Sequence, residues 1–163
     1  MIAARPSPAF AFSHPAHAIA LGFGAGLSPV APGTAGTLVA WPIGWLMGGV
    51  LSPLAFIVTL GLLFIIGIWA CTLTGRRLGV DDHGGMVWDE MVAFLLVLAI
   101  VPRDVRWQLA AFVLFRAFDV LKPQPIRWFE QRYHGGFGVM LDDILAAGYT
   151  LVVLAVAKRV LGW

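Results

Sequence analysis

Twenty consecutive residues without a charge, at positions 54–73, constrain this chain more than any other stretch. At about 1.5 Å per residue, a helix of that length matches the roughly 30 Å hydrocarbon core of a bilayer. The composition agrees, because 60% of the 163 residues are hydrophobic and only 12% are charged. The mean hydropathy of +0.86 also lies far above the values typical of soluble domains. The chain is therefore predicted to be an integral membrane protein.

Prolines, glycines and charged residues divide the rest of the chain into further apolar segments. Helices are predicted at residues 35–51, 54–74, 86–101, 105–121 and 141–160. Pro42 can kink the first of these without ending it, because neighbouring groups satisfy the freed backbone in a membrane helix. Several of the helices are about 15 to 17 residues long, short of the roughly 20 that a full span needs. Tilting or local thinning of the bilayer must make up the difference.

The remaining segments complete the predicted architecture. Residues 125–133 carry apolar and charged side chains in the pattern of a short amphipathic helix at the membrane interface. Glycines at 135, 136 and 138 predict a loop. Residues 1–15 are expected to form a flexible tail before a single membrane domain at 16–163. The predicted fold class is all-α, an integral membrane bundle of about four to five helices with an interfacial amphipathic helix.

Charge and cysteine content exclude several classes of partner and site. The formal net charge is only +2, and the basic residues do not form a run that would grip a phosphate backbone. Nucleic acid is therefore not an expected partner, whereas the lipid bilayer is. The single cysteine, Cys71, lies inside an apolar run, so no disulfide framework or thiolate metal site is expected.

Eight of the nine carboxylates lie in two short segments between apolar helices. The first segment holds Asp81, Asp82, Asp89 and Glu90, and the second holds Asp119, Glu130, Asp142 and Asp143. An acid in so apolar a chain must stay in water, pair with a cation or shift its pKa. If successive helices alternate in direction, both segments reach one membrane face. That face also carries more Lys and Arg than the other, so the positive-inside rule places it in the cytoplasm.

Converging carboxylates without a thiolate predict a site for Mg²⁺, Mn²⁺ or Ca²⁺ rather than for zinc. Asp89 and Glu90 are neighbours, as are Asp142 and Asp143. Because adjacent residues point about 100° apart around a helix, only one acid of each pair is expected to face a given ion. The alternative is that these acids only cap helices and pair with arginines.

Basic and hydroxyl side chains near the acids favour a phosphate substrate. Arg116, Asp119 and Lys122 follow an i, i+3, i+6 spacing along one helix edge. Thr34 and Thr37 lie at a predicted helix start, where backbone N–H groups favour an anion, although a threonine-capped turn would look the same. The glycines at 135–138 could cradle a phosphate or simply turn the chain. His83 and His134 are possible proton donors or only loop histidines.

Four motifs in order carry a resemblance to a known family. They are APGTAGT at 31–37, DDHGGMVWDE at 81–90, FRAFDVLKPQPI at 115–126 and GGFGVMLDD at 135–143. Together they resemble the phosphatidylglycerophosphatase A family of bacterial inner-membrane lipid phosphatases, over roughly residues 20–155. The presence of all four motifs in register makes the likeness far more specific than any single motif.

The resemblance implies an activity and a set of residues. It implies Mg²⁺-dependent removal of the terminal phosphate from phosphatidylglycerophosphate, which gives phosphatidylglycerol, by a multi-pass protein of the bacterial inner membrane. The acids that it marks as catalytic and metal-binding are Asp82, Asp89, Glu90, Asp119, Asp142 and Asp143. Lys122 and Arg127 match positions expected to contact the phosphate. Arg116, from its spacing, and Thr34 and Thr37, from their place at a helix start, complete the predicted substrate-binding set.

Several alternatives stay open at this point. The chain lacks the cysteine, phosphoaspartate and histidine motifs of other phosphatases, which favours metal-assisted hydrolysis, with one or two ions and with water or an aspartate as nucleophile. A different metal-dependent lipid phosphatase or phosphotransferase is a second possibility. A small cation transporter is a third, but it would need acids in the middle of a span, and residues 54–73 contain none. The sequence makes no prediction of the oligomeric state.

Overall fold

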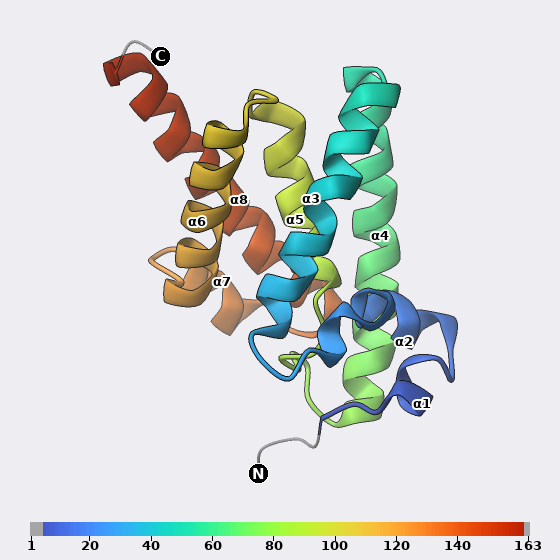
Figure 1. Ribbon diagram of the computed structural model, residues 1–163. Helices are drawn as coiled ribbons and strands as arrows, with labels where there is room; N and C mark the ends of the chain where they lie inside the picture. The colour runs from blue at the N-terminus through green and yellow to red at the C-terminus, as the bar shows by residue number, and fades with distance from the viewer. Residues whose placement is uncertain (1–4, 162–163) are drawn as a thin grey trace.

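The computed structural model describes residues 5–161 and is built of helices, with no strand among those residues (Figure 1). The all-α prediction is therefore confirmed. Three short elements at the N-terminus precede four longer helices, a short helix and the long final helix. Their bounds are α1 Pro8–Ala11, α2 Pro15–Ala20, the 3₁₀ helix η1 Gly22–Leu27, α3 Pro32–Val50, α4 Pro53–Leu78, α5 Trp88–Ile100, α6 Val105–Leu121, α7 Ile126–Arg132 and α8 Gly135–Leu161.

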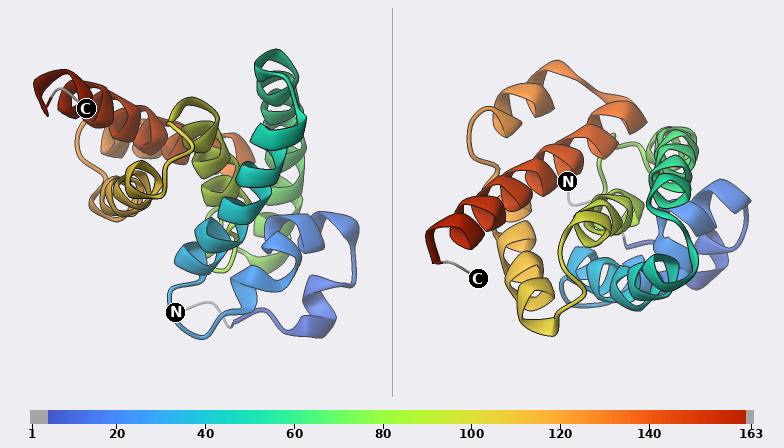
Figure 2. Two further views of the ribbon diagram at one scale, coloured as in Figure 1. Left: turned by 45° about the horizontal axis from the view of Figure 1, so that its top comes forward. Right: turned by 90° about the horizontal axis from the view of Figure 1, so that it is seen from above.

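Helix α5 forms the centre of the molecule. Seen from above, it is enclosed by α3, α4, α6 and α8 (Figure 2), and it packs against each of them. Its sequence after the first turn, MVAFLLVLAI, is apolar on every side, and a helix without a polar face is expected in the interior. Phe94 and Val97 are fully buried in the resulting core.

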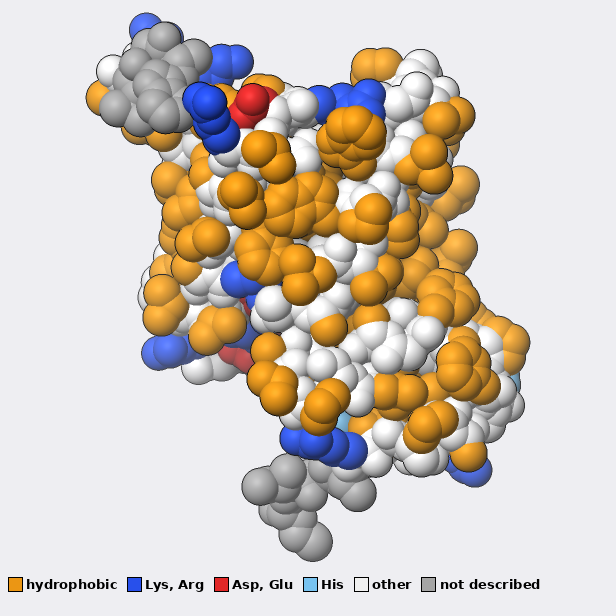
Figure 3. All heavy atoms as spheres, viewed as in Figure 1, with side chains coloured by type: hydrophobic (Ala, Val, Ile, Leu, Met, Phe, Trp, Pro, Cys, Tyr) orange, Lys and Arg blue, Asp and Glu red, His pale blue; other side chains and the backbone are white. Residues whose placement is uncertain are grey.

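The outer surface is apolar where a bilayer would cover it. Two helices of the described chain, α4 and α8, are long and apolar enough to cross a membrane. Large hydrophobic side chains are exposed on α3, α4, α6 and α8, among them Leu54, Leu62 and Val113. Figure 3 shows this hydrophobic band with Lys and Arg gathered toward both ends. Exposed apolar surface of this extent marks a face that contacts lipid or another protein, and the two candidate spans favour lipid.

Local capping explains why most predicted helix bounds agree with the structure. Asp104 accepts hydrogen bonds from the backbone of Arg106 and Trp107, so α6 begins at Val105 as predicted. Ser52 caps α4 in the same way. Gly79, in the left-handed conformation, ends α4. Helix α4 therefore runs four residues past the predicted end at 74.

The loop predicted at glycines 135, 136 and 138 is wrong, because α8 begins at Gly135 rather than at 141. The glycines serve a helix crossing instead. A Cβ at Gly136 would collide with the Ile68 carbonyl oxygen of α4 and lie 2.5 Å from Thr72 Oγ1. The Gly136 N–H donates to the Thr72 hydroxyl at 3.1 Å. Glycine lets the two backbones approach, so Asp142 and Asp143 lie two turns inside α8 and not at its start.

The N-terminal segment packs over the end of the bundle. Helix α1 lies within the segment predicted as a flexible tail, while residues 1–4 lie outside the described residues. His17 of α2 contacts Thr74 of α4 at 2.9 Å, and its ring stacks on Phe10 at 4.4 Å. The domain boundary at residue 15 stays a prediction, as does the interfacial position of α7.

The helices alternate so that chemically rich segments gather at one end of the molecule. The C-terminal end of α4, the start of α5, the end of α6, helix α7 and the start of α8 lie together near the N-terminal elements (Figure 1). The turn between α3 and α4 and the C-terminal end of α8 lie at the other end (Figure 1). This arrangement brings the two acidic segments of the sequence together.

The Gly136 contact can be tested with matched alanine variants. Gly136→Ala should lower the thermal unfolding temperature in detergent by several degrees, because the new methyl group has no room against α4. Gly148→Ala should leave that temperature unchanged or raise it slightly, since nothing lies within 4 Å of its Cβ position and alanine is the better helix former. Equal effects of the two substitutions would contradict the crossing contact.

Candidate active site

A cavity of about 110 Å³ lies between four segments of the chain. They are the loop after α4, the start of α5, the end of α6 and the first turns of α8. All six acids singled out in the sequence line it, together with Lys122. The complete lining is Asp82, Gly84, Met86, Asp89, Glu90, Asp119, Lys122, Val139, Asp142 and Asp143. Residues that are 61 positions apart in the sequence thus share one small space, which we call the acid cavity.

Each helix delivers its acids for a local reason. Asp89 and Glu90 lie in the first turn of α5, where the positive end of the helix dipole favours carboxylates. The start of α5 is anchored because the Val87 N–H donates to the Ala20 carbonyl at 2.8 Å. Lys122 ends α6 with a left-handed backbone (φ 42°), an unusual conformation for a residue other than glycine. This turn directs Lys122 back toward Asp142 of α8.

Three acids form the most compact ligand set in the described chain. One oxygen each of Asp89, Glu90 and Asp143 lie within 4.8 Å of one another. The buried side-chain atoms that lack a hydrogen-bond partner among the described residues all belong to this region. They are Asp89 Oδ1, Glu90 Oε2, Arg116 Nε, Asp142 Oδ1 and Asp143 Oδ2.

Unpartnered carboxylate oxygens in a buried site need a cation or a proton, because desolvated charge is otherwise very unfavourable. An all-oxygen donor set of this kind fits a hard divalent cation such as Mg²⁺, Mn²⁺ or Ca²⁺. The prediction that only one acid of each adjacent pair faces an ion is wrong for Asp89 and Glu90, because the longer glutamate side chain reaches the same point. At the second pair only Asp143 joins the set, while Asp142 approaches Lys122.

Arg116 joins two of the acid-bearing helices. Its Nη1 lies 2.6 Å from Asp119 Oδ2 on its own helix and 3.4 Å from Glu90 Oε1 on α5. Both ion pairs are largely shielded from solvent, so removal of one partner would leave a buried charge unpaired and would cost more than the loss of a surface ion pair. Arg116 therefore holds Glu90 and Asp119 in place, although it does not line the acid cavity.

Lys122 is the cation that lines the acid cavity. Its Nζ lies 2.7 Å from Glu130 and 3.4 Å from Asp142. Burial alone would lower the pKa of this ammonium group, but the hydrogen bond that Lys122 donates to Glu130 and the charge of Asp142 raise the pKa above its ordinary value. Lys122 therefore stays charged at neutral pH. Glu130 was not among the predicted site residues, because an exposed acid on a short helix resembles any solvated side chain.

The structure gives the PGTAGT motif a packing role. A Cβ at Gly33 would collide with Glu90 Oε1 and lie 2.9 Å from Arg116 Nη2. Only glycine lets α3 approach this ion pair so closely. Thr37 is buried and donates to the Gly33 carbonyl at 2.9 Å, and Thr34 is half-buried. Neither threonine lines the acid cavity.

The other predicted residues lie further away. Arg127 and His134 are exposed and do not line the acid cavity. His83 is buried in the loop before α5, where its Nδ1 accepts from the Gly85 N–H at 3.0 Å. The substrate-binding roles of Thr34, Thr37 and Arg127 stay predictions.

Comparison with known proteins identifies the family. A family model described as phosphatidylglycerophosphatase A matches residues 18–158, which include the whole acid cavity. The chain belongs to the phosphatidylglycerophosphatase A family. Members of this family are named for a phosphatase activity, and the chain is accordingly an enzyme of that class. No solved structure matches the chain.

Curated relatives cover nearly the same length. Phosphatidylglycerophosphatase A of Haemophilus influenzae is 43% identical over 151 residues, 92% of this chain and 93% of the relative. The protein of the same name from Escherichia coli is 46% identical over 136 residues, 82% of this chain and 78% of the relative. A Bacteroides thetaiotaomicron protein, provisionally named a phosphatidylinositol-3-phosphatase, is 43% identical over 152 residues, covering 88% and 94%.

The Gly33 contact leads to a prediction for this phosphatidylglycerophosphatase A family member. Gly33→Ala should lower kcat/KM for phosphate release about 10-fold or more, because the methyl group displaces Glu90 and Arg116. Gly48→Ala on the same helix is the control, since its Cβ would meet only ordinary contacts at 3.8 Å or more. Unchanged kinetics in Gly33→Ala, with wild-type folding, would show that the ion pair does not position the site.

Proposed function

We propose that the protein hydrolyses the terminal phosphomonoester of phosphatidylglycerophosphate, giving phosphatidylglycerol and inorganic phosphate in phospholipid biosynthesis. The observation that supports this most is the convergence of six acids and Lys122 on one cavity in a chain of the phosphatidylglycerophosphatase A family. An acid cluster that can bind a metal ion, beside a cationic side chain, suits a phosphoryl group. The oxygens of that group carry negative charge throughout the transfer.

Asp89, Glu90 and Asp143 are the residues that would hold Mg²⁺. The ion supplies charge neutralisation of the phosphoryl oxygens and lowers the pKa of a bound water. Lys122 would contact the phosphoryl group from the other side of the cavity, where its ammonium offers charge-assisted hydrogen bonds. Asp119 is tied to Arg116 and Asp142 approaches Lys122, so both serve to hold these cations.

Asp82 is the one acid of the cavity without a role so far, and we assign it the role of proton acceptor. Within the described chain it forms no ion pair, unlike Asp119 and Asp142. The residue is solvent-exposed, yet its carboxyl group faces the acid cavity. Desolvation raises its pKa, Lys122 opposes that shift, and Glu130 adds to it. A raised pKa makes a carboxylate a stronger base. Water oxygen would bond to phosphorus as its proton passes to Asp82, and the phosphorus–oxygen bond to the lipid glycerol would break. The departing glycerol oxygen would take up a proton from water, and Asp82 would later release its own proton to water.

The protein would act as a multi-pass protein of the bacterial inner membrane with the acid cavity toward the cytoplasm. At the cavity end, Arg76 and Arg77 lie in the last turn of α4, Lys122 is the C-cap of α6, and α7 carries Arg127 and Arg132. At the other end, Arg103 and Arg106 lie around the start of α6, and Lys158 and Arg159 lie in the last turn of α8. The excess of basic residues near the cavity supports that orientation. A cation transporter is less suitable, because the acids gather at one end and the apolar run of α4 contains none.

A different phosphorylated lipid is the second candidate. The Bacteroides relative carries a name for an inositol lipid at similar identity and coverage. Phosphate release should therefore be compared for phosphatidylglycerophosphate, phosphatidylinositol 3-phosphate, phosphatidic acid and soluble glycerol 3-phosphate. We expect kcat/KM to be about 10-fold or more higher for phosphatidylglycerophosphate, on the scale of pocket discrimination. Preference for the inositol lipid would replace the proposed substrate, and no release from any lipid would reject the function.

Metal dependence gives a further prediction. Excess EDTA should abolish phosphate release, and Mg²⁺ should restore it. Asp89→Asn should lower kcat about 10²-fold or more and weaken Mn²⁺ binding measured by electron paramagnetic resonance. Asp104→Asn is the matched control, because Asp104 caps α6 away from the cavity and asparagine caps equally well. Full activity in excess chelator would contradict a metal site.

A further inference from the structure

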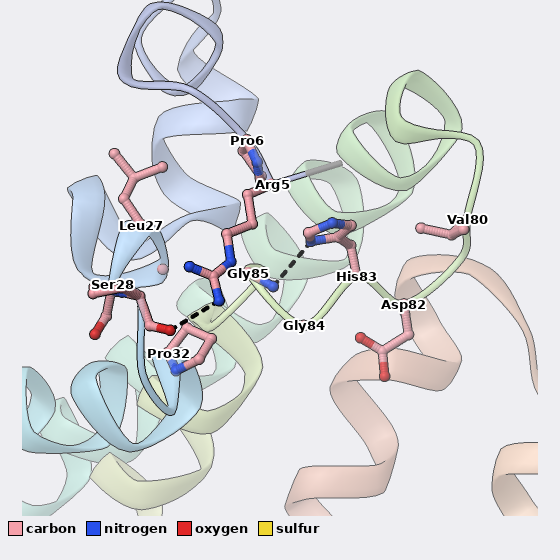
Figure 4. A pocket seen from close by; sticks show the side chains of 12 residues that line it. Arg5, Pro6, Leu27, Ser28, Pro32, Val80, Asp82, His83, Gly84 and Gly85 are labelled. Carbon is pink, nitrogen blue, oxygen red and sulfur yellow. Dashed lines mark hydrogen bonds between the residues drawn. The ribbon is translucent and has the colours of Figure 1, made fainter. Parts of the chain in front are cut away.

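A second, larger cavity adjoins the acid cavity. It has a volume of about 430 Å³ and is lined by the N-terminal segment, the turn before α3 and the loop before α5. Figure 4 shows Arg5 and His83 on its wall with Asp82 and Gly84. We call this space the vestibule.

Two residues belong to both cavities. Asp82 and Gly84 line the acid cavity and the vestibule alike, so the loop that carries them is the partition between the two spaces. Gly84 is exposed, and nothing lies within 4 Å of the position that its Cβ would occupy. Gly84 therefore adds no side chain to the partition, and the space beside it is open.

The vestibule lies beyond the end of a candidate membrane span. It is formed by residues beyond Gly79, the C-cap of α4, and by the turn before α3. Asp142 and Asp143, by contrast, lie two turns inside α8, the other candidate span. With both helices in a bilayer, as the proposed function requires, a lipid substrate would reach the acids from the bilayer, and the vestibule would open to water.

Besides the Asp82 carboxylate that it shares with the acid cavity, the vestibule has two side chains that can donate hydrogen bonds to an anion, Arg5 and His83. Arg5 is exposed and donates one hydrogen bond, from Nη2 to the Pro29 carbonyl at 3.0 Å. A guanidinium has five N–H donors, so it keeps donors for a ligand. His83 Nδ1 accepts from the Gly85 N–H, and a neutral ring then carries its proton on Nε2, which makes that atom a donor.

We propose that the vestibule is the aqueous passage of the active site, through which water enters and inorganic phosphate leaves, with Arg5 as its anion-binding side chain. This inference rests on the proposed function for the identity of the anion. This aqueous passage gives the two products separate routes. The lipid alcohol returns to the bilayer, and the phosphate leaves past Gly84 to the water.

Cysteine labelling tests the passage without relying on catalysis. The native cysteine, Cys71, is fully buried, so the labelling that is measured comes from the introduced cysteine. In the full-length protein, Gly84→Cys should react with a negatively charged methanethiosulfonate reagent, and inorganic phosphate should slow the reaction. Gly61→Cys is the control, because Gly61 also has open space around it but lies in the apolar middle of α4. It should not react. An unreactive Gly84→Cys would overturn the passage even if the protein hydrolyses lipid.

The role of Arg5 is tested in the same background. Adding Arg5→Ala should lower the ratio of labelling rates for negatively over positively charged reagents about threefold or more at low ionic strength, as expected for removal of one nearby charge. Arg77→Ala removes an exposed arginine that does not line the vestibule and should leave the ratio nearly unchanged. Equal effects of the two substitutions, or none from Arg5→Ala, would overturn the anion-binding role.

Discussion

Mutual repulsion among carboxylates is the constraint on which the rest of the structure depends. At an effective dielectric constant near 20, two unit charges about 5 Å apart interact with roughly 3 kcal/mol. Asp89, Glu90 and Asp143 place three such pairs within 4.8 Å. Their combined repulsion approaches the whole stability of a typical domain, about 5–15 kcal/mol. The folded state can hold these acids together only if cations or protons neutralise them, and a divalent cation does so most directly.

The fold meets only part of this constraint, with two cations near the end of α6; within the described chain neither forms an ion pair with Asp89 or Asp143. Arg116 neutralises Asp119 and approaches Glu90, and Lys122 approaches Asp142. The contacts of Arg116 and of Lys122 both depend on close helix packing rather than on long side chains alone. Gly33 lets α3 lie against the Arg116–Glu90 pair, and Gly136 lets α8 cross α4 so that its acids reach the same cavity. Glycines that carry no chemistry thus determine where the charges meet.

The sequence predicted the acids well because charge is conspicuous in an apolar chain. All six acids line one cavity, and α6 begins and ends at the predicted residues. The glycines were harder to interpret, since Gly136 looks the same in a loop and in a helix crossing. Only the approach of Ile68 and Thr72, which are distant in sequence, distinguishes the two cases. The hydroxyl of Thr37 is equally hard to interpret from sequence, because a buried hydroxyl can donate to its own helix, as it does here.

The lining of the acid cavity separates hydrolysis from lipid recognition. Six acids and Lys122 line it, with only Gly84, Met86 and Val139 besides. Such charged groups suit a cation and a phosphoryl group, and a phosphomonoester is the group that phosphorylated lipids share. Relatives of similar identity carry names for glycerol and inositol lipids. In the proposed reaction, headgroup selectivity would therefore come from side chains outside the acid cavity.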